Sequence, residues 1–210
     1  MPHHLQFTVT DLTKEILGVR TVVAYIEDFS EGELVEKEIA FCAQDDDGNV
    51  WYFGEHPEEY KTGEFVEAPT WIAGIQNAKP GVKMWAEPKP GIASYYQGWG
   101  PAVDWSDYAK VDQIGQQTCV PVGCYDNVLV LAESSLGEGD VYQTKYYARE
   151  AGEVRVGWRG PAHVAEELEL TEAEQLGSEA LAVVRADALA VEAHVYQIST
   201  EVYGQTVPAH

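Results

Sequence analysis

Residues 34–54 have the sequence LVEKEIAFCAQDDDGNVWYFG, and this stretch decides the fold. From Leu34 to Ala43 apolar and charged residues alternate, which is the period of two of a half-buried strand. The DDDGN at residues 45–49 is a turn sequence, and the apolar and aromatic residues 50–54 follow it. Asp-Gly between two such runs favours a β-hairpin. The stretch therefore predicts antiparallel β structure.

The same pattern continues on both sides of this hairpin. Residues 5–29 predict a strand, a turn and a strand, with a polar break at residues 11–15. Residues 74–101 are rich in Gly and Pro, which favours a long ordered loop with a short strand near residues 94–97. Further strands are predicted at residues 65–66, 70–72, 110–120, 125–132, 141–149 and 154–158.

The C-terminal region changes period. Residues 171–174 (TEAE) form a capping box, in which Thr171 and Glu174 satisfy backbone amides at a helix start. Apolar residues then recur at intervals of three and four, which predicts a helix over residues 172–199. The members of this stripe are Leu181, Val184, Ala188, Val191, Val195 and Ile198.

Together these elements predict an α+β fold, mostly antiparallel β. We expect a curved sheet or half-barrel of about seven to nine strands with a C-terminal amphipathic helix across its open face or edge. Residues 1–160 form the curved β part, and residues 161–210 supply a C-terminal strand and helix that pack on it within the same domain.

The chain is strongly acidic. It carries 35 Asp and Glu against 13 Lys and Arg, a net charge of −22. Such a surface repels phosphate backbones and anionic membranes, so nucleic acid is not an expected partner. No run of 18 apolar residues exists, so we expect no membrane span. Met1–His4 begins no signal peptide, which leaves open a cytosolic chain and an exported chain whose leader is not part of this sequence.

Cys119 and Cys124 flank the turn sequence VPVG. A disulfide across this hairpin is geometrically feasible, and two free thiols on paired strands are the alternative. A zinc site is disfavoured because no second cysteine pair or spaced histidine pair completes four ligands.

The most informative stretch for function runs from Tyr95 to Tyr108. Its aromatic residues can form a stacking platform for a sugar or another flat ligand, while Asp104 and Asp107 accept hydrogen bonds. The two carboxylates could also serve a glycosidase if they lay about 5 to 9 Å apart. The alternative is that the rings plug one end of the sheet. The predicted ligand-binding residues are Tyr95, Tyr96, Trp99 and Trp105.

Two polar clusters are weaker candidates. His56 lies among Glu55, Glu58 and Glu59, where an imidazole can act as an acid, a base or a metal ligand, or belong to a solvated loop. The second cluster offers alternate oxygen ligands for a divalent cation such as calcium, or a simple hairpin turn, since the EF-hand pattern is incomplete. Its members are Asp45, Asp47 and Asn49.

Three segments resemble motifs of a group of bacterial envelope and secreted proteins. They are AQDDDGNVWYFGE at residues 43–55, VPVGCYDNVLV at residues 120–130 and KYYAREAGEV at residues 145–154. The resemblance covers roughly residues 8–158. It implies an exported protein of the secreted or cell-envelope class, with a curved sheet similar to lipoprotein-carrier half-barrels. It implies no activity.

Three functions follow as hypotheses. The first is a binding protein for an apolar or carbohydrate-like small molecule in a pocket on the concave sheet. The second is a hydrolase, metal-assisted or not, that uses Asp104, Asp107 or His56 as acid or base, and it predicts clustered acids with shifted pKa values. The third is an assembly subunit or homo-oligomer that pairs by strand addition, and it predicts an exposed hydrophobic edge strand.

Overall fold

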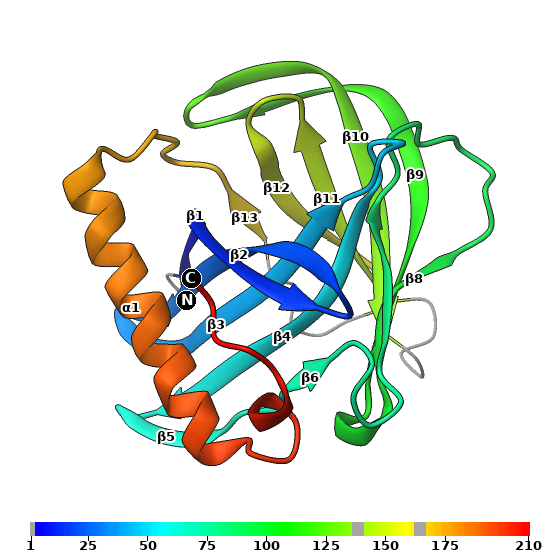
Figure 1. Ribbon diagram of the computed structural model, residues 1–210. Coiled ribbons are helices and arrows are strands. Elements are labelled where there is room, and N and C mark those ends of the chain that lie inside the picture. The colour runs from blue at the N-terminus through cyan, green and yellow to red at the C-terminus, as the bar shows by residue number, and fades with distance from the viewer. Residues whose placement is uncertain (1–2, 136–140, 162–166) are drawn as a thin grey trace.

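The computed structural model describes residues 3–135, 141–161 and 167–210. Within these residues one 13-stranded sheet contains every strand, in the order β1-β2-β3-β4-β7-β8-β9-β10-β11-β12-β13, with β5 and β6 paired to β4. All pairings are antiparallel, and the sheet is open and curved (Figure 1). The predicted α+β fold with a C-terminal helix is confirmed.

The elements have the following bounds. The first seven strands are β1 (His3–Ile16), β2 (Val19–Ser30), β3 (Glu33–Gln44), β4 (Val50–Lys61), β5 (Glu64–Glu67), β6 (Trp71–Ile72) and β7 (Lys79–Met84). The others are β8 (Tyr95–Gly100), β9 (Trp105–Val120), β10 (Gly123–Ser135), β11 (Tyr142–Ala148), β12 (Gly152–Arg159) and β13 (Leu168–Glu169). The helix is α1 (Ser178–Ile198), and the short 3-10 turns are η1 (Pro101–Val103) and η2 (Tyr203–Gln205).

The two faces of β1–β4 differ because side chains alternate along a strand. One face lies under α1, and we call it the helix face; its buried apolar cluster includes Val23, Ile39, Phe41, Val191 and Val195. The opposite face is turned toward β8–β11, and we call it the inner face (Figure 1). There Ala24, Ile26 and Ala40 share a cluster with Trp71 of β6 and with Trp105, the first residue of β9.

A buried ion pair fixes α1 and the C-terminal residues to β1. The Lys14 ammonium, 0% exposed, lies 2.9 Å from the Glu192 carboxylate of α1 and donates to the Val207 carbonyl. The Tyr203 hydroxyl and the Ala209 amide also donate to Glu192. Because removing one partner of such a pair leaves an uncompensated buried charge, this network holds the C-terminal segment in place.

The structure corrects the predicted polar break at residues 11–15. Strand β1 continues through it to Ile16, and the turn falls at Leu17–Gly18. The polar residues belong to the strand because Lys14 is buried against Glu192, while a register shift between Val9 and Thr13 absorbs the irregularity. Strand β4 likewise runs on to Lys61, beyond the predicted end at residue 54.

Residues 74–101 are not a single long loop, because they contain β7 and β8. The glycines permit this pairing: a Cβ on Gly81 would lie 2.4 Å from the Tyr96 carbonyl oxygen, so the two strands approach too closely for any other residue. The short strand predicted near residues 94–97 is present as β8, but β8 runs on to Gly100, so Trp99 also lies within a strand and not in a loop.

The helix begins later than predicted. It starts at Ser178 after an extended Gly177, so the capping box at residues 171–174 is not used. A glycine inside the helix would cost about 1 kcal/mol relative to alanine, and starting after it avoids that cost. No described helix is long and apolar enough to cross a membrane.

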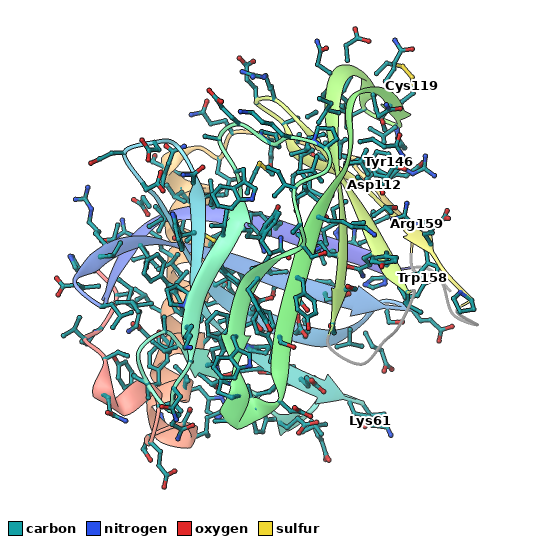
Figure 2. All side chains as sticks on the ribbon, turned by 90° about the vertical axis from the view of Figure 1, so that its right-hand side faces the viewer. Lys61, Asp112, Cys119, Tyr146, Trp158 and Arg159 are labelled. Carbon is teal, nitrogen blue, oxygen red and sulfur yellow. A yellow bond between two sulfur atoms is a disulfide. The ribbon has the colours of Figure 1, made fainter. Side chains whose placement is uncertain are left out.

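The β9–β10 hairpin carries a disulfide at its tip. Cys119 and Cys124 are bonded, which decides between the two alternatives that the sequence left open, and Figure 2 shows Cys119 at the end of the hairpin. Cys42, on the inner face of β3, is a free thiol.

Candidate functional site

The inner face carries a set of polar side chains that begins at an irregularity in β4. The pairing of β3 with β4 shifts between Phe41 and Cys42, so that Phe53 is an extra residue and Gly54 adopts φ +147°. Such a bulge re-aims the following side chain. As a result Tyr52 and Glu55, three residues apart, both lie on the inner face.

Tyr52 stands between two carboxyl groups. Its hydroxyl lies 3.1 Å from Glu38 Oε1 and also hydrogen-bonds Glu55 Oε2, while the Trp71 indole N–H donates to Glu55 Oε1 at 3.0 Å. A phenol has one hydrogen and cannot donate to two carboxylates at once. One carboxyl group must therefore carry a proton.

The raised pKa of Glu55 lets it hold that proton at neutral pH. Burial, and then the negative charge of Glu38, raise the pKa of Glu55 to about 8. Burial and the charge of Glu36 also raise the pKa of Glu38. The hydrogen bonds then run in one direction at neutral pH: Glu55 donates to the Tyr52 oxygen, and Tyr52 donates to Glu38.

Lys83 of β7 links this pair to the opposite wall. Its ammonium lies 4.4 Å from the centre of the Tyr52 ring. Its positive charge lowers the pKa of Glu38 on β3 and of Glu133 on β10. For each carboxyl group burial acts in the opposite direction, raises the pKa and is the larger single effect. Burial raises the pKa of the nearby Cys42 thiol, which keeps it protonated and unreactive.

On the wall formed by β8–β11, Glu133 is the central group. It is 5% exposed, lies 3.0 Å from the Lys145 ammonium, and accepts a 2.8 Å hydrogen bond from the Gln97 amide. Burial raises the pKa of Glu133, but Lys145 and Lys83 outweigh it and the net pKa is lowered. Burial lowers the pKa of Lys145, but the negative charges of Glu133 and Glu153 outweigh burial and the net pKa is raised. The pair is therefore ionised.

A cavity of about 230 Å³ opens beside this pair. Asp107 stands in its wall and accepts a 2.9 Å hydrogen bond from the Ser135 hydroxyl. Burial raises the pKa of Asp107, and the hydrogen bond from Ser135 only partly offsets it. The indole N–H of Trp158 is buried and has no hydrogen-bond partner among the described residues. The described lining consists of Asp107, Glu133, Ser134, Ser135, Val141, Gln143 and Trp158.

The four aromatic residues predicted to bind ligand do not form one platform. Trp105 stacks on Trp71 with ring centres 4.7 Å apart, inside the inner-face cluster. Tyr96 is 50% exposed and packs on Tyr108, whereas the hydroxyl of its neighbour Tyr95 is buried. Trp99 lies under the Lys79 ammonium at 5.0 Å. None of the four lines the cavity.

The three weak catalytic candidates separate in the same way. Asp107 lines the cavity, but Asp104 is exposed, in a left-handed conformation at the end of η1. His56 lies on the helix face, 0% exposed, between the Thr70 hydroxyl at 2.6 Å and Glu58 at 3.2 Å. It is therefore part of the packing between sheet and helix.

His194 of α1 joins His56 at the same carboxylate, at 2.7 Å from Glu58. The side chain of His194 is 38% exposed, and its ring nevertheless reaches the buried carboxylate from the surface of α1. Its contact with a residue 136 positions earlier depends on how α1 packs.

The candidate cation ligands occupy a hairpin turn. Asp45 Oδ1 accepts hydrogen bonds from the Asp47 and Asn49 amides, and Oδ2 accepts from the Asn49 side chain and the Trp51 indole. These four hydrogen bonds satisfy both oxygens of the Asp45 carboxylate within its own hairpin. The described residues contain no group of three or more His, Cys, Asp or Glu side chains arranged to hold a metal.

The sequence did not single out the remaining groups of the inner face. Glu38 looked like the solvent side of a half-buried strand, and Glu133 and Lys145 were ordinary charged residues in predicted strands. They come together only because the sheet curls, and one available signal was the charge within otherwise apolar segments such as VLVLAE at residues 128–133.

No protein-family model, curated protein or solved structure matches this chain.

Proposed function

We propose that the protein binds a small, hydroxyl-rich, carbohydrate-like molecule in the cavity beside Asp107 and Glu133. The observation that carries this proposal is the chemistry of the cavity wall. It combines two carboxyl groups with the Trp158 ring and the polar side chains of Ser135 and Gln143, and the indole N–H of Trp158 has no hydrogen-bond partner among the described residues.

A hydroxyl group both donates and accepts, so a ring bearing several of them can serve the carboxylates and the indole N–H together. The indole also offers a flat apolar surface to such a ring. An apolar ligand would instead leave these polar groups desolvated without partners, at about 1–3 kcal/mol for each one. The wall therefore favours the carbohydrate-like over the apolar ligand.

The size of the cavity limits the ligand. At about 230 Å³ it is smaller than the ~300–1,000 Å³ of typical ligand pockets. It suits one ring-sized unit, either a free molecule or the end of a longer one. The positive charges of Lys145 and Lys83 act on both carboxyl groups of the wall, which gives the bound ring a fixed electrostatic environment.

A thermal-shift and calorimetry screen tests the proposal, with monosaccharides, polyols and short fatty acids as probes. We expect saturable binding of one sugar or polyol, because a ligand at 100 times its dissociation constant stabilises the folded state by about 2.7 kcal/mol. Trp158→Phe keeps an aromatic surface but replaces the indole by a smaller ring without an N–H, so it should weaken binding about tenfold. Trp99→Phe, outside the cavity, should not.

The proposal fails if only fatty acids bind, or if Trp158→Phe and Trp99→Phe bind the same sugar equally well. Failure of the whole panel to shift the melting temperature at millimolar concentrations also counts against it.

A hydrolase is the second candidate, and one observation favours it. Asp107 and Glu133 line the same cavity with pKa values moved in opposite directions, Asp107 up and Glu133 down. Pairs of this kind mark general acid and base roles. Asp107 would be the acid and Glu133 the base or nucleophile in cleavage of a glycosidic bond.

Chromogenic glycosides separate the two candidates. A hydrolase should release the chromophore, and Asp107→Asn should abolish turnover while binding persists. A pure binding protein should bind the glycoside and return it intact, with Asp107→Asn reducing affinity only.

A further inference from the structure

The packing contacts of His56 also form a chain of hydrogen bonds that ends at a second cavity. His56 and Glu58 are two residues apart in β4, so both side chains lie on its helix face. In the antiparallel pairing of β4 with β6, Glu55 lies opposite Trp71. Continued by one residue, this register brings Thr70 next to His56, and His56 Nδ1 lies 2.6 Å from the Thr70 hydroxyl oxygen.

The second cavity has a volume of about 360 Å³ and lies at the C-terminal end of α1, which Figure 1 shows near β6 at the bottom of the view. This volume falls within the ~300–1,000 Å³ of typical ligand pockets. The described lining includes Thr70, Gln76, Glu201 and the apolar side chains of Val103 and Val202. No lining residue is shared with the cavity beside Glu133, so the two sites are separate.

The ionised Glu58 sets the direction of the hydrogen bonds. Burial raises its pKa, but the hydrogen bonds that Glu58 accepts outweigh burial and bring the pKa to about 2. An ionised carboxylate only accepts, so the Nε2–H of His56 donates to Glu58 at 3.2 Å. In a neutral imidazole the other nitrogen, Nδ1, is then an acceptor. The Thr70 hydroxyl donates to it at 2.6 Å, a shorter contact than the 3.2 Å to the Ala68 carbonyl oxygen.

We propose that Thr70 is a nucleophile that cleaves small uncharged esters in this cavity, with His56 as its general base. A hydroxyl is a weak nucleophile unless an adjacent base takes its proton, and a third group must orient that base. Thr70, His56 and Glu58 stand in this order. The two ring nitrogens are exchanged relative to the serine protease triad, but in both arrangements one nitrogen accepts from the nucleophile and the other donates to the carboxylate.

The reaction balances with water as its co-reactant. The Thr70 oxygen attacks the ester carbonyl carbon while its proton passes to Nδ1 of His56. The bond to the alcohol oxygen then breaks, and the alcohol leaves with the proton from Nδ1. A water molecule, deprotonated by the same nitrogen, attacks the acyl group on Thr70, which regains a proton as the carboxylic acid leaves. Glu58 stabilises the imidazolium that forms in each step.

The cavity wall also supplies donors for the oxyanion that forms in this reaction. The Gln76 side chain and the backbone amides of Thr200 and Glu201 have no hydrogen-bond partner within the part of the chain that the structure describes. Donors of this kind stabilise the negative charge on the carbonyl oxygen. Glu201 is the one charged residue of the described lining, and its carboxylate repels an ester that carries a negative charge. The site therefore favours an uncharged ester.

Hydrolysis of p-nitrophenyl acetate by the full chain tests the proposal. We expect saturable release of p-nitrophenol above the rate in buffer, and Thr70→Val should lower it at least about tenfold, since the base then has no hydroxyl to activate. Thr70→Ser keeps a hydroxyl in place and should remain active, which separates lost chemistry from lost stability. Thr118→Val is the matched control: Thr118 is buried, at 6% exposed, but lies on β9 outside the lining. It should hydrolyse the ester like the wild type.

Mass spectrometry after an acid quench gives an independent readout. The acetyl group should be found on the peptide that contains Thr70. The charge of the substrate gives a further readout, because p-nitrophenyl hemisuccinate carries a carboxylate and should be a poorer substrate than p-nitrophenyl butyrate. Glu201→Gln should reduce this difference.

No hydrolysis above the rate in buffer would overturn the proposal. So would a rate that Thr70→Val leaves unchanged, or acetyl groups found only on lysine, tyrosine or cysteine side chains. An equal loss of activity in Thr70→Val and Thr118→Val would also count against it, because the activity would then follow stability and not the Thr70 hydroxyl.

Discussion

Glu55 and Glu58 lie three residues apart in the same strand and differ in almost every property. Glu58 faces the helix, and its two oxygens accept from His56, His194 and the Tyr60 hydroxyl. Burial raises the pKa of Glu58, but these donors outweigh it and bring the pKa to about 2. Glu55 faces inward beside Glu38, and its pKa is about 8.

The comparison teaches that burial does not decide the role of a carboxyl group, but its partners do. Glu58 has enough donors to remain an anion in the core, so it serves to hold α1 on the sheet. Glu55 has one donor, the Trp71 indole, and a competing carboxylate beside it, so it holds a proton at neutral pH. Groups with environments of the second kind are the ones found at functional sites.

The largest expected effect comes from neutralising the carboxylate on the helix face. Glu58→Gln should lower the free energy of unfolding at pH 7 by about 3 kcal/mol. The substitution removes the negative charge that the buried His56 ring and the half-buried His194 ring both contact. Chemical denaturation measures this. Glu59→Gln, in the same strand, is the control and should stay within about 0.5 kcal/mol of wild type.

The acid limb of the stability curve checks the same point. The folded pKa of Glu58 lies below the unfolded value, so its contribution is present above about pH 4.5 and is lost as the pH falls toward 2. Glu58→Gln should flatten this limb. An unchanged acid limb would show that Glu58 is not the anion described here.

The second prediction removes the bulge that places Glu55 beside Tyr52 on the inner face. A Cβ on Gly54 would lie 2.5 Å from the Trp71 carbonyl oxygen, at a φ of +147°. Gly54→Ala should therefore cost about 2 kcal/mol or more and move Glu55 from its place beside Tyr52. Gly63→Ala is the control: its φ is also positive, at +77°, but nothing lies within 4 Å, so only the backbone strain of about 1 kcal/mol remains.

The β-hairpins could be predicted from the sequence because each is specified by neighbouring residues. Asp-Gly at residues 47–48 and the alternation in residues 34–43 specify β3 and β4 without help from the rest of the chain. Sequence reasoning missed β7 because Pro80 and Gly81 oppose a strand, and only the close approach of β8 explains them. It also placed the helix start at residue 172, before the observed start at Ser178.

The inner site was largely beyond sequence reasoning, for a physical reason. Glu55 was recognised only as a neighbour of His56, but adjacent residues of a strand lie on opposite faces, and the bulge at Phe53–Gly54 places Glu55 beside Tyr52 on the inner face. The contacts of Glu38 with Tyr52, and of Glu133 with Lys145, join residues 14 and 12 positions apart on different strands. Asp107 was predicted as a candidate and does line the cavity.

The third prediction concerns the proton on Glu55. Its folded pKa lies above the unfolded value, so its contribution is fully favourable below about pH 4.5 and is lost as the pH rises toward 8. Glu55→Gln keeps the shape and the acceptor for Trp71 but cannot ionise. It should match the wild type near pH 4 and exceed its stability by at least ~1 kcal/mol at pH 9. Equal stability at both pH values would argue against a protonated Glu55.

The smallest expected effect comes from removing one of the three donors to Glu58. The His194 side chain is 38% exposed, so solvent can replace part of its hydrogen bond, while His56 and Tyr60 still hold the carboxylate. His194→Ala should cost about 1 kcal/mol, well below Glu58→Gln, since the buried anion keeps two partners. Gln197→Ala, one turn away on an exposed position of α1, should cost less than about 0.5 kcal/mol. If His194→Ala cost as much as Glu58→Gln, the carboxylate would depend on this single imidazole, and the contrast with Glu55 would rest on one contact instead of three.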